Sequence, residues 1–438
     1  MADAATITHP RVLTIAVPVV ISNITTPILG AVDTGVVGQT GTAVPIGAVG
    51  IGAVIIAAVY WFFGFLRMGT TGLAAQAIGR ADAEELAALL TRVLLIGGAG
   101  GMVIFLLQIP ITRVAFRLSP ASEEVEQLAH TYLTIRFLSA PAAVAMFGLT
   151  GWLIARERTA AVLIIQLWIN GLNIMLDLIF VLGLDRGVDG VATATVIAEW
   201  TGLMLGLWLV RRGFADGHWR VWARVFDRAR LWRMAQLNGD ILIRSLLLQT
   251  ALLSFVFFGA GLGDVTLAAN QVLVQFLMFA SYALDGFAFA AEALVGQAVG
   301  ARARGTLRRA VSINAQWTLV AMLVLCALTW VFGGHVIAVM TPAPDIRAEA
   351  AVYLPWLIAA PILCGPSFLL DGIFIGATRG RDLRNMMALS FAAYGAALGL
   401  LTGPFGNHGL WAAFMVFFVA RAVTLMARYP VLVSDLGR

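Results

Sequence analysis

The chain has 438 residues, of which 60% are hydrophobic and 12% are charged. A soluble globular protein carries about 25% charged residues, so this composition excludes an ordinary soluble domain and indicates a polytopic membrane protein. The net charge of +5 does not indicate nucleic-acid binding, because the basic residues, all of them arginine, lie in short segments between apolar runs. We therefore expect the lipid bilayer, and no nucleic acid, as a partner.

Twelve membrane-spanning helices are predicted along the chain. Uncharged runs recur that meet the rough criterion of about 18–20 residues for crossing a bilayer as a helix. These runs lack the alternation of a membrane β-barrel, so the predicted fold class is an all-α polytopic membrane protein. The predicted spans are residues 12–38, 46–71, 89–110, 127–149, 159–183, 190–211, 237–260, 266–298, 310–333, 349–374, 386–403 and 409–430.

The arginines predict how the chain is oriented. They cluster in every second connection between spans, most densely over residues 211–233. The alternate connections hold only Arg113, Arg117, Arg186 and Arg347. Cytoplasmic loops of membrane proteins carry an excess of basic residues, so both termini are expected to face the cytoplasm. We expect a multi-pass protein of a bacterial cytoplasmic membrane.

The second half of the chain repeats the first. An offset of 221 residues pairs Gln76 with Gln297, Gly79 with Gly300, Tyr132 with Tyr353, and Arg158 with Arg379. Near the ends the offset slips to 219, which pairs Gly187 with Gly406. We predict an N-terminal lobe over residues 1–211, a cytoplasmic interfacial linker over 212–234 and a C-terminal lobe over 235–438. Six helices per lobe in the same orientation imply a pseudo-two-fold axis along the membrane normal and alternating access by rocking.

Two carboxylates interrupt apolar spans of the first lobe. Asp33 and Asp177 lie where an ionised side chain is expensive and usually functional. Asn173 lies one turn before Asp177 on the same helix face, and Thr195 lies a short way into the next helix. These oxygen groups suit Na⁺ or a shared proton. The structural alternative is that both carboxylates cap helix ends, but Asp177 lies about 12 Å from the nearest loop, too deep for that.

The second lobe holds Ser254 and alanines at the matching places, so we expect buried charge mainly in the first lobe and a passive second lobe. Five further residues are candidates for a cavity or a substrate contact: Tyr132, Glu199, Asp285, Glu292 and Asp371. Each has a structural alternative, because a carboxylate in a span also caps helices or pairs with arginine, and a tyrosine also belongs to interfacial aromatic belts.

The sequence lacks the motifs of other function classes. It has no phosphate-binding loop with a Gly-Lys-Ser/Thr ending, so we expect transport that is not driven by ATP on this chain. The five histidines are scattered, without a metal cluster or a nucleophile elbow. We therefore expect no enzyme and no cofactor beyond a coupling H⁺ or Na⁺.

Several segments resemble the multidrug and toxic compound extrusion (MATE) family. The first predicted helix contains "VDTGVVGQTG", and "RMGTTGLAAQAIGRAD" (67–82), "LAANQVLVQFLMFASYALDGFAFAAEALVGQAVGARARG" (267–305) and "DGIFIGATRGRDLRN" (371–385) look like its DNA-damage-inducible protein F branch. The resemblance implies a secondary antiporter in which Na⁺ or H⁺ enters while organic cations or other toxic compounds leave. It implies a cation site at Asp33, Asn173, Asp177 and Thr195, and first-helix bending at Pro18.

We therefore expect a monomeric, cation-coupled antiporter that exports small organic compounds, cationic or amphipathic in character. The alternative is a flippase for lipid-linked saccharides, a related two-lobe architecture with a wide, arginine-rich cavity. Apart from arginines in the terminal turn of a span, only four fall within the predicted spans: Arg67, Arg136, Arg244 and Arg421. A membrane-embedded lipid enzyme is a third reading, which would need the histidine or nucleophile constellation that the sequence lacks.

Overall fold

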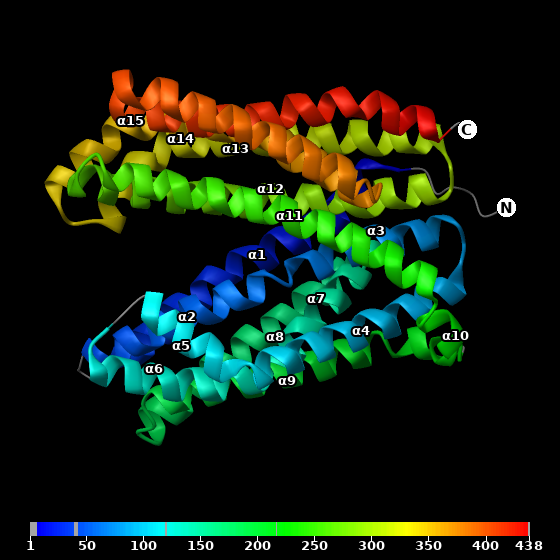
Figure 1. Ribbon diagram of the computed structural model, residues 1–438, viewed down its shortest axis with the longest axis horizontal. Coiled ribbons are helices and arrows are strands. Elements are labelled where there is room, and N and C mark those ends of the chain that lie inside the picture. The colour runs from blue at the N-terminus through cyan, green and yellow to red at the C-terminus, as the bar shows by residue number, and fades with distance from the viewer. Residues whose placement is uncertain (1–6, 39–42, 119–120, 216, 437–438) are drawn as a thin grey trace. The chain divides into compact units, whose positions relative to one another are not determined.

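The computed structural model describes residues 7–38, 43–118, 121–215 and 217–436, and these are almost entirely helical, without a β-strand among them (Figure 1). The first half contains α1 (His9–Gly38), α2 (Ala43–Trp61), α3 (Gly64–Gly79), α4 (Ala83–Leu106), α5 (Gln108–Leu118), α6 (Glu123–Arg136), η1 (Phe137–Ser139), α7 (Ala140–Ala155), α8 (Thr159–Asp177), η2 (Leu178–Gly183) and α9 (Val188–Leu209). The remainder contains η3 (Arg211–Phe214), η4 (His218–Arg220), α10 (Trp222–Val225), α11 (Arg228–Ala260), α12 (Asp264–Gly300), α13 (Arg304–Met340), α14 (Pro344–Gly376) and α15 (Gly380–Asp435).

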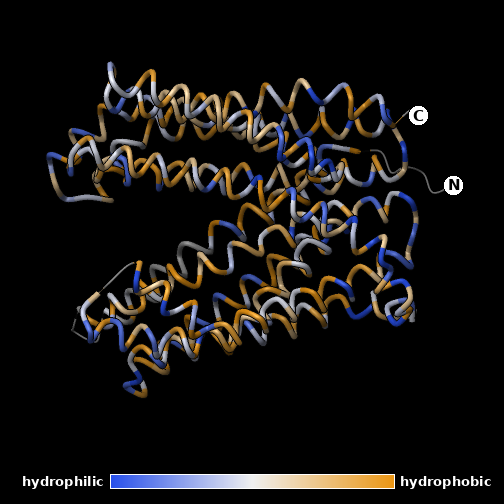
Figure 2. The backbone as a smooth tube through the Cα atoms, in the orientation of Figure 1, coloured by the Kyte–Doolittle hydropathy of each residue, from blue (hydrophilic) through white to orange (hydrophobic). Residues whose placement is uncertain are grey.

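The twelve predicted spans are confirmed as long apolar helices. Within the described part of the chain, 10 helical segments are long and apolar enough to cross a membrane. One of these is α15, in which two spans join at Gly406, whose φ of 53° and ψ of −129° interrupt the helix. The 30-residue α1 supplies the remaining span. Hydrophobic residues run along the helices and hydrophilic residues gather near their ends (Figure 2).

The segment predicted as an interfacial linker is docked on α4. It forms η3, η4, α10 and the start of α11. Arg92 of α4 donates from Nε to the carbonyl oxygen of Val225 (2.9 Å) and from Nη2 to that of Arg224 (2.7 Å). Arg224 in turn donates to both carboxylate oxygens of Asp82, at 2.7 and 2.8 Å. The connection between the repeats is therefore fixed to the helix bundle by hydrogen bonds from buried and half-buried arginines.

Small residues let α4 and α7 pack closely, as the "GGAGG" run at 97–101 predicts. A Cβ atom added to Gly97 would lie 2.6 Å from the Cα of Ala145. At Gly101 the same atom would lie 2.3 Å from the carbonyl oxygen of Ala140. The two glycines are one turn apart, so they form a flat seam on which the backbone of α7 lies directly.

The internal repeat is visible in the backbone. Three pairs of residues with positive φ are separated by 221 positions: Ala81 (55°) and Arg302 (54°), Glu157 (59°) and Thr378 (53°), Asp185 (51°) and Gly406 (53°). The predicted pairing of Gly187 with Gly406 is wrong in this respect, because the backbone of Gly406 matches that of Asp185. The offset of 219 applies only from Gly190 and Gly409 onward, since the first repeat has two extra residues directly before Gly190.

The chain packs into two compact units that are both discontinuous in sequence. One unit contains residues 1–20, 71–81 and 232–438, and the other contains 21–70 and 82–231. Each unit therefore takes in part of α1, and the division within α1 follows Pro18 by two residues. The predicted lobe boundaries, which follow the repeats instead of the packing, stay a prediction.

The repeat segments that contain Gly79 and Gly300 meet inside the first of these units. A Cβ atom on Gly79 would lie 2.0 Å from the carbonyl oxygen of Gln297. A Cβ atom on Gly300 would lie 2.3 Å from the carbonyl oxygen of Gln76. Gly79 is equivalent to Gly300, and Gln76 is equivalent to Gln297, so the two contacts are the same contact made once from each repeat. This is the pattern of an isologous two-fold interface. The fold class predicted from the sequence, with repeats related by pseudo-two-fold symmetry, is confirmed at this seam.

Candidate cation-coupling site

Asn173 on α8 and Thr195 on α9 are hydrogen-bonded across the helix interface. The Nδ2 of Asn173 donates to the Oγ1 of Thr195 at 2.9 Å. The Thr195 hydroxyl donates in turn to the carbonyl oxygen of Val191, at 3.0 Å on its own helix. Asn173 is fully buried and Thr195 is 6% exposed. The structure thus brings together two of the four residues that the sequence predicts for the site.

Asp177 lies on the same helix, one turn beyond Asn173. Its side chain is fully buried, and burying a carboxylate is unfavourable unless it is paired or hydrogen-bonded. Asp177 is also the last residue of α8 before the π-helix η2. Segments of π-helix are rare and occur frequently at functional sites, because the wider turn changes which backbone groups are hydrogen-bonded. Asp33 belongs to α1 by its backbone, and its side chain lies outside the described residues.

The polar face of α8 is longer than the sequence analysis recognised. Gln166 donates from Nε2 to the Oδ1 of Asn170 at 2.9 Å, and Asn170 donates from Nδ2 to the carbonyl oxygen of Thr25 at 3.3 Å. With Asn173 and Asp177, these amides follow one helix face at intervals of three and four residues. Three amides and a carboxylate at this spacing in an apolar helix were the signal that could have identified the face. Asn170 attaches it to the carboxy-terminal part of α1.

Glu199 of α9 is paired with a buried arginine. Its two carboxylate oxygens accept from Nη2 and Nη1 of Arg136, at 3.0 and 3.1 Å. Arg136 also donates to the Oγ of Ser139 at 3.0 Å, and its carbonyl oxygen accepts from the hydroxyl of Tyr60 at 3.4 Å. This bidentate geometry satisfies both charged groups inside the span. Glu199 was a candidate for a cavity or substrate contact, with pairing to an arginine as the alternative. The structure shows the pairing with arginine.

Tyr132, another predicted cavity residue, is only 3% exposed. Its ring lies against α2 at Gly52, where an added Cβ would come within 2.3 Å of the ring. Tyr132 therefore fills space between α2 and α6.

The second half holds a buried ionic group of its own, so buried charge is not confined to the first lobe. The carboxylate of Asp371 on α14 pairs with Arg244 of α11 and with Arg421 of α15. The Nε of Arg421 donates to the Oδ1 of Asp371 at 3.2 Å. Arg421 is fully buried, and its guanidinium lies 5.4 and 5.7 Å from the ring centres of Phe368 and Phe418. The partners lie 127 and 50 positions from Asp371 along the chain, so the sequence could not pair them.

Glu292 and Asp285 both lie on α12. Glu292 is 1% exposed, whereas Asp285 is half-buried. The carbonyl oxygen of Glu292 is approached by Gly376 of α14, where an added Cβ would lie at 2.4 Å. The close packing of α12 on α14 contributes to the burial of Glu292.

An all-helical membrane bundle built from two repeats, with a polar face inside its first repeat, is an architecture typical of membrane transporters. The chain belongs to the MatE family, whose model matches residues 18–179 and 241–401, one stretch in each repeat. It is therefore a multidrug and toxic compound extrusion transporter and not an enzyme.

Several relatives agree with this assignment. The chain is 41% identical over 420 residues to the DNA damage-inducible protein F of Escherichia coli K12, covering 94% of this chain and 90% of the relative. It is 22% identical over 314 residues to the multidrug export protein MepA of Staphylococcus aureus MSSA476, covering 72% of this chain and 69% of MepA. The fold matches the bent form of the Vibrio cholerae MATE transporter VcmN, with a TM-score of 0.88 and 22% identity over 98% of both chains.

Proposed function

We propose that this transporter is a cation-coupled antiporter, in which H⁺ or Na⁺ entry drives the export of small organic compounds, cationic or amphipathic in character. The observation that carries the proposal is the buried polar face of α8, with Asp177 one turn from Asn173 and Asn173 hydrogen-bonded to Thr195. Carboxylate, amide and hydroxyl oxygens are ligands that Na⁺ accepts, and a buried carboxylate is also a proton acceptor. The resemblance to the family adds Asp33 to this set.

The ion pairs of Glu199 and Asp371 bear on the flippase alternative. Glu199 is held by one arginine and Asp371 by two. Three of the four arginines that lie away from the ends of the spans are engaged in these pairs. This arrangement does not favour the flippase alternative, which calls for arginines that face a wide cavity.

Binding at this site would change the conformation through α1. Pro18 lacks the N–H group that would bond to the carbonyl oxygen of Thr14, so α1 bends there more easily than an uninterrupted helix. We propose that cation binding at Asp33 and Asp177 reshapes α1 and releases substrate outward. Only a difference in cation affinity between the two conformations can drive that shift.

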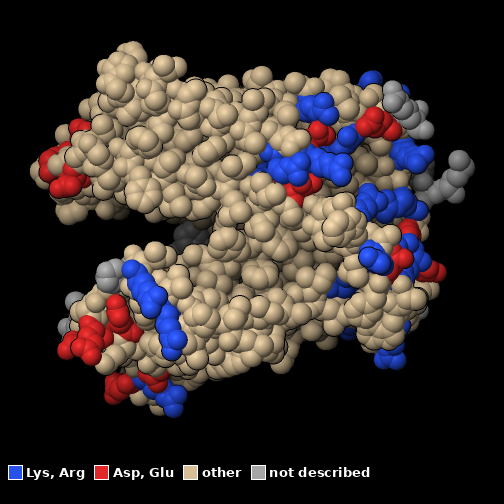
Figure 3. Space-filling view, viewed as in Figure 1, with Lys and Arg blue, Asp and Glu red and all other residues tan. Residues whose placement is uncertain are grey.

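The membrane potential is a sufficient source of energy. Entry of one charge releases roughly 2.3 kcal/mol per 100 mV. Coupled to a neutral substrate, this corresponds to about fifty-fold accumulation. We further propose that the protein acts as a monomer in a bacterial cytoplasmic membrane with both termini in the cytoplasm. In the unit that contains α11–α15, the basic side chains in view gather toward one end of the helices, with some acidic ones among them, and acidic side chains lie at the other end, which supports this orientation (Figure 3).

The test is efflux of a fluorescent organic cation from proteoliposomes, under an imposed pH gradient and, separately, an imposed Na⁺ gradient. Asp177→Asn is expected to reduce the gradient-driven rate at least tenfold, because the amide can neither release a proton nor offer a charge to Na⁺. Asp33→Asn should do the same, and Asn173→Ala should weaken the apparent cation affinity. Asp345→Asn, at the start of α14, is the matched control and should transport normally. Wild-type rates from both Asp33→Asn and Asp177→Asn would refute the proposal.

A further inference from the structure

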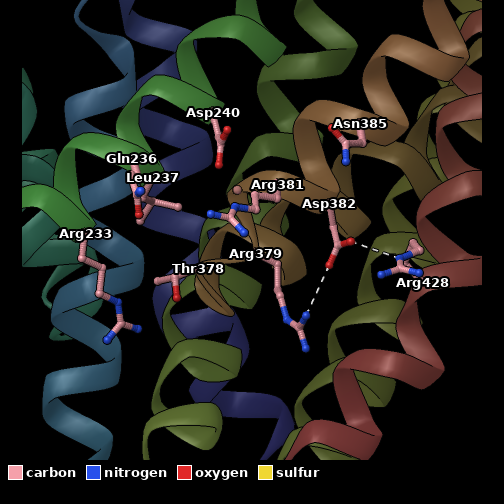
Figure 4. A pocket seen from close by; sticks show the side chains of 11 residues that line it. Arg233, Gln236, Leu237, Asp240, Thr378, Arg379, Arg381, Asp382, Asn385 and Arg428 are labelled. Atoms are coloured by element: carbon pink, nitrogen blue, oxygen red, sulfur yellow. Dashed lines mark hydrogen bonds and ion pairs between the residues drawn. The ribbon is translucent and has the colours of Figure 1, made fainter.

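The ends of α11, α14 and α15 enclose a pocket of about 450 Å³ that the transport mechanism does not use (Figure 4). All of its lining residues belong to the unit that contains residues 232–438. The charged ones are four arginines and two aspartates: Arg233, Arg379, Arg381, Arg428, Asp240 and Asp382. We call this the basic pocket.

Both aspartates of the basic pocket are already paired. Asp382 accepts from the Nε of Arg428 at 3.0 Å and lies 3.6 Å from the Nη1 of Arg379 (Figure 4). Asp240 accepts from Arg384, which lies outside the lining, at 2.5 Å. Both carboxylates of the pocket are therefore already paired with Arg379, Arg384 or Arg428.

Arg233 and Arg381 remain without a carboxylate partner among the described residues. Both are exposed, and the Nη2 of Arg233 makes only a long hydrogen bond of 3.4 Å to the Oε1 of Gln76. A pocket lined by two cations without acidic partners carries a net positive charge, and an anion would be stabilised in it.

The backbone adds donors to the same pocket. Helix α15 begins at Gly380, and its N-cap residue Arg379 provides no side-chain cap. The first-turn N–H groups of a helix have no partner within the helix and carry a partial positive charge. Gly380 also brings this helix start against α11, since an added Cβ would lie 2.9 Å from the Cβ of Asp240. Guanidinium groups and helix N–H donors thus line one small volume.

The fold does not require these charges. The equivalent turn of the first repeat has the same positive φ, at Glu157 as at Thr378. At an offset of 221, however, Arg381 and Asp382 correspond to Ala160 and Ala161. The turn therefore forms without them.

We infer that the basic pocket binds the phosphate of an anionic phospholipid headgroup. The pocket lies at helix ends, and Trp232, directly before Arg233, is 65% exposed. Tryptophan prefers the level of the headgroups, and basic pockets between helix ends at the cytoplasmic surface recognise anionic headgroups. A soluble phosphate has the same recognising chemistry but no acyl chains to hold it beside Trp232.

The first experiment measures the melting temperature of the full-length protein in a neutral detergent. Phosphatidylglycerol should raise it by at least 3 °C more than phosphatidylcholine does. Arg233→Gln/Arg381→Gln should lose more than half of that difference, because these two arginines would bind the phosphate. The double substitution leaves no carboxylate without an ion-pair partner, so it should not destabilise the protein by itself. Arg113→Gln/Arg117→Gln, which removes two exposed arginines of α5, is the matched control and should keep it. An undiminished difference in the pocket variant, or an equal effect of phosphatidylcholine, would overturn the inference.

Two further measurements keep the inference testable. In the first, inorganic phosphate and glycerol phosphate are added without lipid. If either raises the melting temperature as much as phosphatidylglycerol does, the pocket binds a soluble anion and the proposal of a lipid ligand is refuted. In the second, a photoactivatable phosphatidylglycerol is crosslinked to the wild-type protein. This measurement needs no variant, so it does not depend on whether a variant folds. Labelled peptides should include residues 378–385, and labelling confined to other segments would overturn the inference.

Discussion

Charged side chains within the spans are compensated by specific partners. Arg136 is held by Glu199 and Ser139, and Arg421 by Asp371 and two aromatic rings. Transferring one ion from water to a protein interior costs several kcal/mol, so a pair is stable only while both members are present. Removing one partner therefore affects stability more than removing both.

Arg136→Leu is expected to lower the free energy of unfolding by about 3 kcal/mol, because it leaves the Glu199 carboxylate partly buried without its cation. The measurement is the melting temperature in detergent. Arg136→Leu/Glu199→Leu should be more stable than Arg136→Leu alone, and Arg186→Leu, at an exposed loop arginine, should resemble wild type. If Arg136→Leu melts like wild type, the pair contributes nothing to stability.

At the residue scale the sequence predicted part of the candidate site. The spacing of Asn173 and Asp177 on one helix follows from the sequence, because helical periodicity is local. The bond from Asn173 to Thr195 depends on how α8 packs on α9. The pairing of Asp371 with Arg244 and Arg421 depends on contacts between helices far apart in the chain. Such contacts are set by packing, for which a single sequence gives no local signal.

At the element scale, glycine spacing determines how closely helices approach. Gly97 and Gly101 lie against the backbone of α7, whereas nothing lies within 4 Å of the position that a Cβ on Gly98 would take. In a bilayer the lipid tails are as apolar as the helix surfaces, so the hydrophobic effect does not drive helices together. Their association relies instead on close packing of this kind. The run of glycines thus has members with different roles.

Gly101→Ala is expected to destabilise the protein by about 1–3 kcal/mol, because its methyl group meets the backbone of α7, which cannot move aside easily. Gly98→Ala is the control within the same run, and should be neutral or up to about 1 kcal/mol stabilising through helix propensity. Thermal unfolding in detergent distinguishes them. Equal effects of the two substitutions would mean that the seam is not closely packed.

The elements themselves were largely predictable, since a run of apolar residues long enough to span a bilayer is a strong local signal. The ends were not. The helix that was predicted to end at residue 71 continues as α3 to Gly79, and the last two spans are joined through Gly406. Beyond the apolar run, helix ends depend on turns such as those at Ala81 and Glu157, where a residue other than glycine has positive φ. Nothing in their identity indicates that conformation.

At the scale of the whole molecule, the distribution of arginine makes a prediction about orientation. In a background of Cys326→Ser/Cys364→Ser, a cysteine replacing Arg212 is expected to react with a membrane-impermeant maleimide only after the membrane is opened. A cysteine replacing Arg117 should react in intact cells, because it lies on the side with few basic residues. Both native arginines are exposed, so each position is accessible to reagent. The opposite labelling pattern would reverse the proposed topology.

The division of α1 between the two units has a consequence for biosynthesis. Residues 7–20 are synthesised before residues 232–436, yet the two segments pack in the same unit. The beginning of α1 must therefore wait in the membrane without its final neighbours until the second repeat has been inserted. A polypeptide cut in the connection over 212–234 would separate residues 71–81 and the start of α1 from the second repeat with which they pack, so the second repeat alone cannot complete its unit.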